Sequence, residues 1–217
     1  MLTLYEELYL LALDEEKGNI FRIVRKFLPY ALAGAILAEL ALLGKVEAGE
    51  KSRLNLLEAT PTGDPILDET LEQISTSEKA RKLTYWVSRL SEDPKKLRQN
   101  AAERLVGRNV LLQEEKRFFR NPAMNGSEIS VTEKFQLKYL LRSIILSNGE
   151  SDSRSLALLN LIVAGDLLGL IFTQDEIENA RRMIHKQVMA TAMENQIMQF
   201  IEEIELAVSS VLENEME

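Results

Sequence analysis

The sequence predicts a mainly α-helical protein: a single globular domain over residues 1–217, built around one buried apolar helix and carrying a protruding β-hairpin. Three observations lead to this prediction. Leu, Ala and Glu are abundant, whereas the 217 residues include only 10 Gly and 5 Pro, a composition that favours helix. The segment 29–43 is apolar on nearly every side, as expected of a helix enclosed by the rest of a domain. A segment rich in turn formers, 121–126, separates two strand-like runs.

The first part of the chain contains the apolar helix and its neighbours. Apolar residues at helical spacing predict a first helix over 2–12. The apolar helix follows over 29–43 and ends at Gly44, a residue type that commonly terminates helices. Glu39 lies within this helix, and because an unpaired buried charge is costly, we expect its carboxylate to have a buried partner. In the segment 45–59, apolar and polar residues alternate loosely, a pattern that is compatible with short strands.

Turn and capping signals divide the middle of the chain. The segment 61–65 reads Pro-Thr-Gly-Asp-Pro and predicts a rigid turn. Asp64 is expected to cap a helix over 66–74, because its side chain can accept hydrogen bonds from the free N–H groups of the first turn. A second helix is predicted over 77–90. The third runs over 94–107, with its proline in the first turn.

The later part of the chain is predicted to hold the hairpin and further helices. The hairpin covers about residues 110–131, with Val110–Phe119 as one arm and Ile129–Val131 as the other. Thr173 and Glu176 have the spacing of a capping box at a helix start. Helices are predicted over 132–146, 153–172, 175–192 and, as an acidic C-terminal helix, about 194–212. Nothing in the composition marks a domain boundary.

Charge is distributed unevenly along the chain. The formal net charge is −8, which argues against bulk binding to nucleic acid. The segment 79–120 nevertheless contains twelve Lys and Arg against five Asp and Glu, a local balance of +7. From Glu194 onwards there are seven Glu and no basic residue. Such asymmetry suggests one basic face that meets an anionic partner, and the alternative is an ordinary solvated helix surface.

The residue types that usually carry catalysis are scarce. The sequence has no cysteine, which excludes disulfides and thiolate metal sites. Its single histidine, His185, falls on an amphipathic helix, and the glycine motifs of phosphate loops and nucleophile elbows are missing. The sequence therefore predicts a protein that is not an enzyme and has no cofactor or metal. No secretory signal opens the chain, and the apolar run 28–43 is short for a membrane span of about 20 residues, which predicts a cytoplasmic protein.

Six short segments, taken in order, resemble one known family. They are Leu2–Leu8 with Leu10–Leu13; Gly34 with Glu39–Leu42 and Gly44–Val46; Pro61–Asp64 with Leu67–Glu69; Trp86 with Leu90 and Ser91; Leu105, Val106, Arg108, Val110 and Leu111 with Glu115 and Lys116; and Leu156–Leu158, Leu161, Ala164, Asp166, Leu167 and Phe172. Each match is weak alone, but six in the right order over roughly 2–188 are specific. The chain resembles the Golgi phosphoprotein 3 family, whose members bind phosphoinositide headgroups.

The resemblance implies a helical fold with a protruding hydrophobic hairpin and a pocket for phosphatidylinositol 4-phosphate. In the family, a Trp and an Arg near the buried helix belong to that pocket, and here Val24 and Ala33 stand in their places. Two basic residues on the helix before the hairpin also belong to it. They correspond to Lys95 and Arg98, or to Arg98 and a neighbour if a gap is placed differently. The basic N-terminal arm of eukaryotic members does not precede the first helix, which predicts a prokaryotic relative.

The basic segment and the resemblance together predict a peripheral membrane adaptor that binds an anionic lipid headgroup. Arg and Lys hold phosphate oxygens well, so the headgroup is expected to bind Lys95, Arg98 and Arg108 on one positive surface near the base of the hairpin. The expected partner is an anionic phospholipid membrane surface and not a nucleic acid. The expected location is cytoplasmic, at the membrane periphery.

The hairpin supplies the predicted apolar contact with the membrane. Phe118, Phe119 and Met124 are expected to enter the interface as a wedge. The alternative is that both Phe side chains cover the core, since alternate side chains of a strand face opposite sides.

A second function is also left open, in which the chain is a protein–protein interaction module without lipid binding. The contact would then be the acidic tail or an apolar groove. The protein partner is unknown, and a homo-oligomer is left open.

Overall fold

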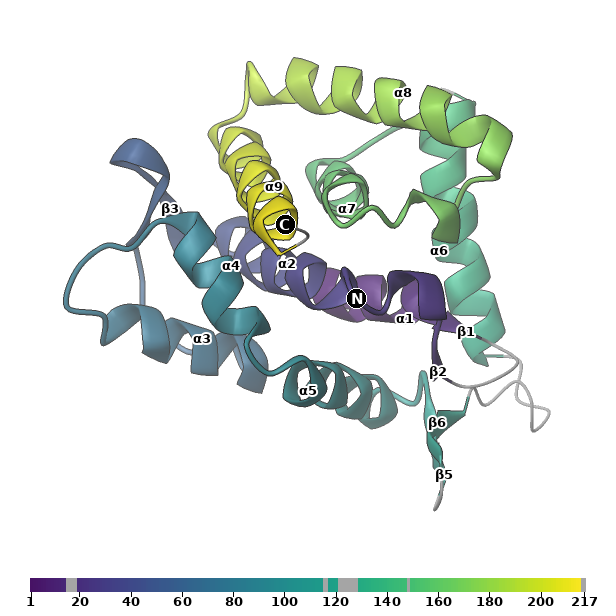
Figure 1. The fold of residues 1–217 in the computed structure, drawn as a ribbon, viewed down its shortest axis with the longest axis horizontal. Helices are drawn as coiled ribbons and strands as arrows, with labels where there is room; N and C mark the ends of the chain where they lie inside the picture. Colours follow the sequence, from purple (N-terminus) through teal and green to yellow (C-terminus); the bar gives the residue numbers. More distant parts are fainter. Residues whose placement is uncertain (15–18, 115–116, 121–128, 148, 216–217) are drawn as a thin grey trace.

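The computed structural model describes residues 1–14, 19–114, 117–120, 129–147 and 149–215, and it is mainly helical, as predicted (Figure 1). The elements are α1 (Leu4–Ala12), β1 (Leu13–Asp14), β2 (Asn19–Ile20), η1 (Arg22–Val24), α2 (Leu28–Leu42), β3 (Val46–Gly49), η2 (Glu50–Ser52), β4 (Arg53–Leu56), α3 (Pro65–Ser75), α4 (Leu83–Ser91), α5 (Pro94–Gly107), β5 (Leu112–Glu114), β6 (Arg117–Arg120), α6 (Ile129–Leu146), α7 (Ser153–Ala164), η4 (Leu168–Leu170), α8 (Gln174–Ala192) and α9 (Gln196–Asn214). The strands form separate antiparallel pairs: β1 with β2, β3 with β4, and β5 with β6.

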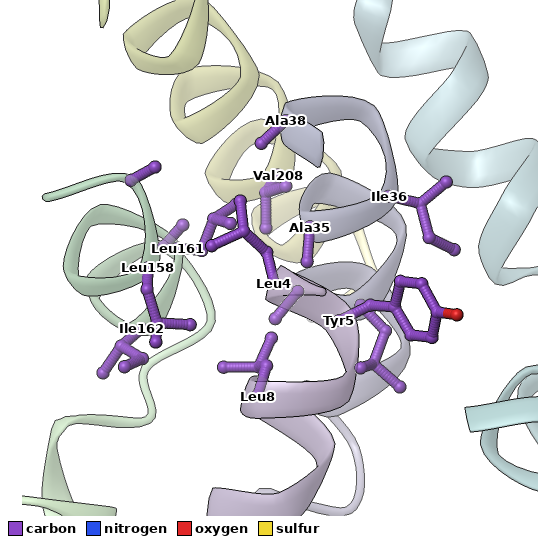
Figure 2. Close-up of a cluster of buried hydrophobic side chains, with 14 of the residues drawn as sticks. Leu4, Tyr5, Leu8, Ala35, Ile36, Ala38, Leu158, Leu161, Ile162 and Val208 are labelled. Carbon is purple, nitrogen blue, oxygen red and sulfur yellow. The ribbon is translucent and has the colours of Figure 1, made fainter. Parts of the chain in front are cut away.

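Helix α2 is the centre of the domain, as its all-round apolar pattern predicts. Helices α1, α4, α7 and α9 pack against it, and Figure 2 shows side chains from α1, α7 and α9 meeting it. The helices approach closely at Gly34, where a Cβ atom would come within 2.7 Å of a Val208 methyl group and 2.9 Å of one of Leu161. The glycine therefore permits α7 and α9 to lie against the backbone of α2.

The buried carboxylate of Glu39 has the partner that the sequence predicts. The Arg154 guanidinium on α7 lies 3.0 Å from Glu39 Oε1, and the backbone N–H of Leu4 donates to Glu39 Oε2 at 2.7 Å. Arg154 also donates to the Leu2 carbonyl oxygen. One buried acidic side chain thus joins α1, α2 and α7, because both oxygens of the charge must be satisfied where water is excluded.

The predicted helix caps are confirmed. The Asp64 side chain accepts hydrogen bonds from the N–H groups of Ile66 and Leu67 at the start of α3. Thr173 and Glu176 form the capping box of α8, in which the Thr173 N–H donates to the Glu176 carboxylate at 2.9 Å. Such caps depend on residues within one helical turn, so they can be predicted from local sequence.

Two predicted helices are shorter in the structure. The helix expected over 77–90 begins at Leu83, because Arg53 and Lys82 form an isolated bridge and the Leu54 N–H donates to the Arg81 carbonyl at 2.9 Å. These backbone groups bond across to β4 and are not available for helix. The helix expected over 153–172 ends at Ala164 and is followed by the short turn η4.

The hairpin exists and projects from the helical body (Figure 1), but its second arm does not lie where the sequence predicts. Strands β5 and β6 both fall within or just beyond the segment expected to form a single arm, with Leu112 opposite Arg120 and Glu114 opposite Arg117. The segment 129–131, expected as the second arm, is instead the start of α6. These residues extend the helix predicted from residue 132, and backbone groups that bond within this helix are not available to a strand. Phe118 and Phe119 lie in β6, and Met124 lies outside the described residues.

Within the part of the chain that the structure describes, no helix combines the length and apolar character needed to cross a bilayer. The most apolar one, α2, contains 15 residues, whereas a span requires about 20.

Candidate anion-binding surface

Helix α5 carries three basic residues at its start: Lys96, which pairs with Glu69 at 2.7 Å, and the two predicted headgroup residues Lys95 and Arg98. Asp93 caps this helix by accepting hydrogen bonds from the N–H groups of Lys95 and Lys96, and Pro94 occupies the first turn. Lys95 is exposed and Arg98 is half-buried. Their spacing of three residues places them on neighbouring turns of one helix face. Neither forms an ion pair with a described residue, so both charges remain available to an anion.

Arg98 also lies close to helix α1. Burial raises the pKa of Tyr9 to about 12, and the positive charge of Arg98 opposes that rise. The guanidinium is therefore near enough to act on the phenol electrostatically. Helices α1 and α5 also pack against each other.

Arg108, the third predicted headgroup residue, has a different environment. It lies at the C-terminal end of α5, where its Nε donates to the fully buried Glu6 carboxylate at 2.8 Å. A rise of about 1.5 Å per residue puts Lys95 about 20 Å away along the helix. Arg108 is thus at the hairpin end, as predicted, while Lys95 and Arg98 are at the far end. The three side chains do not converge on one headgroup.

Arg104 belongs with Arg108 in a second ionic cluster under α1. Its guanidinium lies 2.9 Å from the Asp64 carboxylate and 3.5 Å from that of Glu6. The Tyr5 hydroxyl donates to Asp64 at 2.7 Å, and burial together with this carboxylate raises the pKa of Tyr5 above its usual range. These residues connect α1, α3 and α5 through charges that are largely removed from water.

The structure adds a basic loop that the sequence reasoning did not single out. Arg22, Arg25 and Lys26 are exposed in and after η1, and none of them forms an ion pair with a described residue. Between them Ile23 is 79% exposed. The Phe21 N–H donates to the Ala12 carbonyl at 3.0 Å, which attaches the loop to the end of α1. The sequence feature that could have identified this loop is the presence of three cations within five residues, with two apolar residues between them.

Val24 and Ala33, the positions that the sequence resemblance matches to a Trp and an Arg, have no exposed side chain. Neither side chain has a polar group to offer a ligand. The cations of this region come from the basic loop and from the start of α5. The loop is hydrogen-bonded to α1 at Ala12, and the charge of Arg98 acts on Tyr9, three residues earlier in the same helix.

The described residues contain no group of three or more His, Asp or Glu side chains placed to hold a metal ion. What they do contain is an apolar central helix enclosed by amphipathic helices, with short β-hairpins at the edges and unpaired cations on the surface. These features define a class of mainly α-helical domains that present charged surfaces.

The profile of the Golgi phosphoprotein 3 family (GPP34) matches residues 4–203, and the chain belongs to this family. A curated relative is Vacuolar protein sorting-associated protein 74 of Eremothecium gossypii, 29% identical over 138 residues. The alignment covers 54% of this chain and 41% of that protein. The chain thus spans less than half the length of the curated relative it matches. The predicted family is confirmed, and the prokaryotic origin stays a prediction.

Proposed function

We propose that the chain is a cytoplasmic, peripheral membrane adaptor that binds an anionic phospholipid headgroup of the phosphatidylinositol 4-phosphate type. Membership of the Golgi phosphoprotein 3 family is the observation that carries the proposal. The unpaired cations Lys95 and Arg98 support it, since they are the two positions that correspond to basic residues of the family's headgroup pocket. No step of this function requires a catalytic group.

The headgroup phosphate is held by charge-assisted hydrogen bonds from Lys95 and Arg98. The N-terminus of α5 adds a favourable dipole, although the Asp93 carboxylate already occupies two of its N–H groups. Cations close to an anionic membrane contribute about 1 kcal/mol each. With a formal net charge of −8, the protein depends on these local cations and not on its overall charge.

The basic loop supplies a second contact with the same membrane. Arg22, Arg25 and Lys26 attract phosphates, and the exposed Ile23 buries its side chain in the interface. Strand β2, which precedes the loop, neighbours β6 of the hairpin. Phe118 and Phe119 of β6 are proposed to enter the membrane from there, as is Met124, which lies outside the described residues.

Sedimentation with vesicles tests the headgroup site. The probe is phosphatidylcholine vesicles with and without a few per cent phosphatidylinositol 4-phosphate, at low and high salt. The Lys95→Glu/Arg98→Glu variant is expected to lose binding, because it removes two attractive charges and adds two repulsive ones. Binding by the unaltered chain is expected to weaken as salt rises, because exposed charges are screened.

A matched control reverses two other exposed cations. Arg182 and Lys186 lie four residues apart on the outer face of α8, so Arg182→Glu/Lys186→Glu changes the net charge by the same amount. This control is expected to keep vesicle binding, and both variants are expected to keep the helical circular dichroism. Equal losses in the two variants would show a general charge effect and would refute the site on α5.

The alternative is a protein–protein interaction module, and a specific surface favours it. Leu57 and Ile197 are exposed and line a cavity of about 500 Å³ between β3 and α9. If the unaltered chain fails to bind anionic vesicles even at low salt, the lipid function is refuted and this apolar surface becomes the leading contact.

A further inference from the structure

A second polar cavity lies away from the β5–β6 hairpin. It has a volume of about 390 Å³ and is lined by residues of the β3–β4 hairpin and of the segment 75–82 that leads into α4. Figure 1 shows β3 and the β5–β6 hairpin at opposite ends of the molecule. The volume suits a small ligand, since ligand pockets usually measure about 300–1,000 Å³. A membrane held at the β5–β6 end therefore leaves this cavity open to soluble molecules.

The cavity has unpaired positive charge at its mouth. Lys79 and Arg81 line it, and neither forms an ion pair with a described residue. Lys82 and Arg53 are next to it, with Arg53 Nη1 donating to the Ala80 carbonyl oxygen. Two acidic side chains are also nearby: Glu47 in the lining and Glu78 in the same segment. The local balance is four cations to two acids, which favours an anionic occupant.

The lining also contains buried donors that lack an acceptor. Trp86 is 3% exposed, and its indole N–H has no hydrogen-bond partner among the described residues. The Nε–H of Arg81 is likewise buried and unpartnered. Buried donors are almost always satisfied, so two unsatisfied ones in one cavity wall indicate a missing acceptor. Both nitrogen atoms are covered by their neighbours, whereas the Arg81 side chain as a whole is only half-buried.

Aromatic contacts connect the cation to the indole. The Arg81 guanidinium lies 5.0 Å from the centre of the Tyr85 ring, and the Tyr85 and Trp86 ring centres are 5.3 Å apart. A ligand that draws Arg81 away from Tyr85 therefore changes the environment of Trp86. The Ser77 hydroxyl, which lines the cavity and donates to the Lys79 carbonyl oxygen, is a further polar group at the mouth.

We propose that this cavity binds the phosphate monoester of a small soluble molecule. A phosphate monoester offers several acceptor oxygens and about two negative charges, which match the Lys79 ammonium, the Arg81 guanidinium with its unsatisfied Nε–H, and the unsatisfied indole N–H of Trp86. The apolar lining residues Leu54 and Ile74 accommodate the carbon skeleton that carries the phosphate. The same chemistry exists on a lipid headgroup, and the vesicle arm of the test separates the two sources.

The lone tryptophan gives a direct test. Trp86 is the single Trp of the 217 residues, so the full chain labelled with ¹⁵N has one indole N–H resonance to follow. Glycerol 3-phosphate is titrated into the protein at constant ionic strength, with glycerol and sodium chloride as blanks. A saturable shift of the indole resonance is expected. Lys79→Ala/Arg81→Gln is expected to weaken this binding about tenfold or more, because both phosphate-binding charges are gone.

The remaining arms separate the proposal from its competitors. Arg182→Gln/Lys186→Ala removes two exposed cations on α8 and is expected to keep the shift. Lys95→Glu/Arg98→Glu is also expected to keep it, even though vesicle binding is lost, so failure of one site does not imply failure of the other. An indole shift that is absent in the unaltered chain, reproduced by chloride, or insensitive to the substitutions at Lys79 and Arg81 overturns the proposal. A shift seen only with phosphatidic acid vesicles overturns the soluble source.

Discussion

Two sets of basic side chains in this domain differ in what surrounds them. Arg104, Arg108 and Arg154 point at carboxylates that are almost fully buried beneath α1 and within α2. Lys95 and Arg98 at the start of α5 form no ion pair with a described residue. The first set sits between helices that must pack, whereas the second sits on a surface that is free to meet a ligand.

The difference shows why a count of basic residues is a poor guide to a binding surface. Removing a charge from water costs several kcal/mol, and the structure recovers this only when a partner is placed accurately. The arginines beneath α1 are therefore committed to the fold. An exposed, unpaired cation stays in contact with water, so it contributes little to stability in either direction. Its charge therefore remains available for binding.

The largest expected effect is at Arg154. Arg154→Ala leaves the Glu39 carboxylate buried without its cation and is expected to lower the free energy of unfolding by about 3–5 kcal/mol. Urea titration followed by circular dichroism measures this. Arg181→Ala is the control, because Arg181 and its partner Asp166 are 40% and 70% exposed, and a cost below about 0.5 kcal/mol is expected there. A similar small cost at both positions would remove the distinction between the two sets.

A smaller effect is expected at Arg108, which the sequence predicts to bind a headgroup and the structure shows paired with Glu6. Arg108→Ala removes a cation from the fully buried Glu6, with Arg104 still nearby, and is expected to cost about 1–3 kcal/mol of stability. Lys95→Ala is expected to cost less than about 0.5 kcal/mol. Well below the unfolding temperature, vesicle binding is expected to fall more in Lys95→Ala than in Arg108→Ala. The reverse order would restore Arg108 to the headgroup site predicted from the sequence.

The smallest effect concerns pH and Glu7. Burial raises the pKa of Glu7 to about 7 from an ordinary value of 4.5, while Arg154 opposes the rise from 3.7 Å. The folded chain thus binds a proton that the unfolded chain has released, so this residue's contribution to stability falls as pH rises from 4.5 to about 7. Glu7→Gln is expected to flatten that slope and to be about 1–2 kcal/mol more stable than the unaltered chain near pH 8. Parallel pH profiles for the two chains would rule out this assignment.

The elements that the sequence predicted correctly are those defined by nearby residues. The apolar character of 29–43 predicted α2, and the side chains of Asp64 and Thr173 predicted helix starts, because a cap acts within one turn. The charge on Glu39 predicted a buried partner without revealing which residue it is. The six-segment resemblance predicted the family, which the match over 4–203 confirms.

The errors arose where backbone groups bond across the chain. Strands β5 and β6 pair with each other within 112–120, and α6 begins at residue 129. The second arm of the hairpin therefore does not lie at 129–131, where it was expected. The bond from Leu54 to the Arg81 carbonyl delayed the start of α4, and a helical pattern in 77–82 carries no sign of it. Local propensity is a weak preference that such tertiary hydrogen bonds override.

The sequence by itself determined that the domain is mainly helical, that one helix lies at its centre, and that cations gather between 79 and 120. Only the tertiary structure decided which basic side chains form ion pairs with buried carboxylates. Arg108 meets Glu6 across 102 residues and Arg154 meets Glu39 across 115, distances along the chain at which no periodicity or spacing carries information. The physical reason is that helical patterns report burial of a face through neighbours three and four residues apart, whereas an ion pair forms only where packing brings two distant helices together.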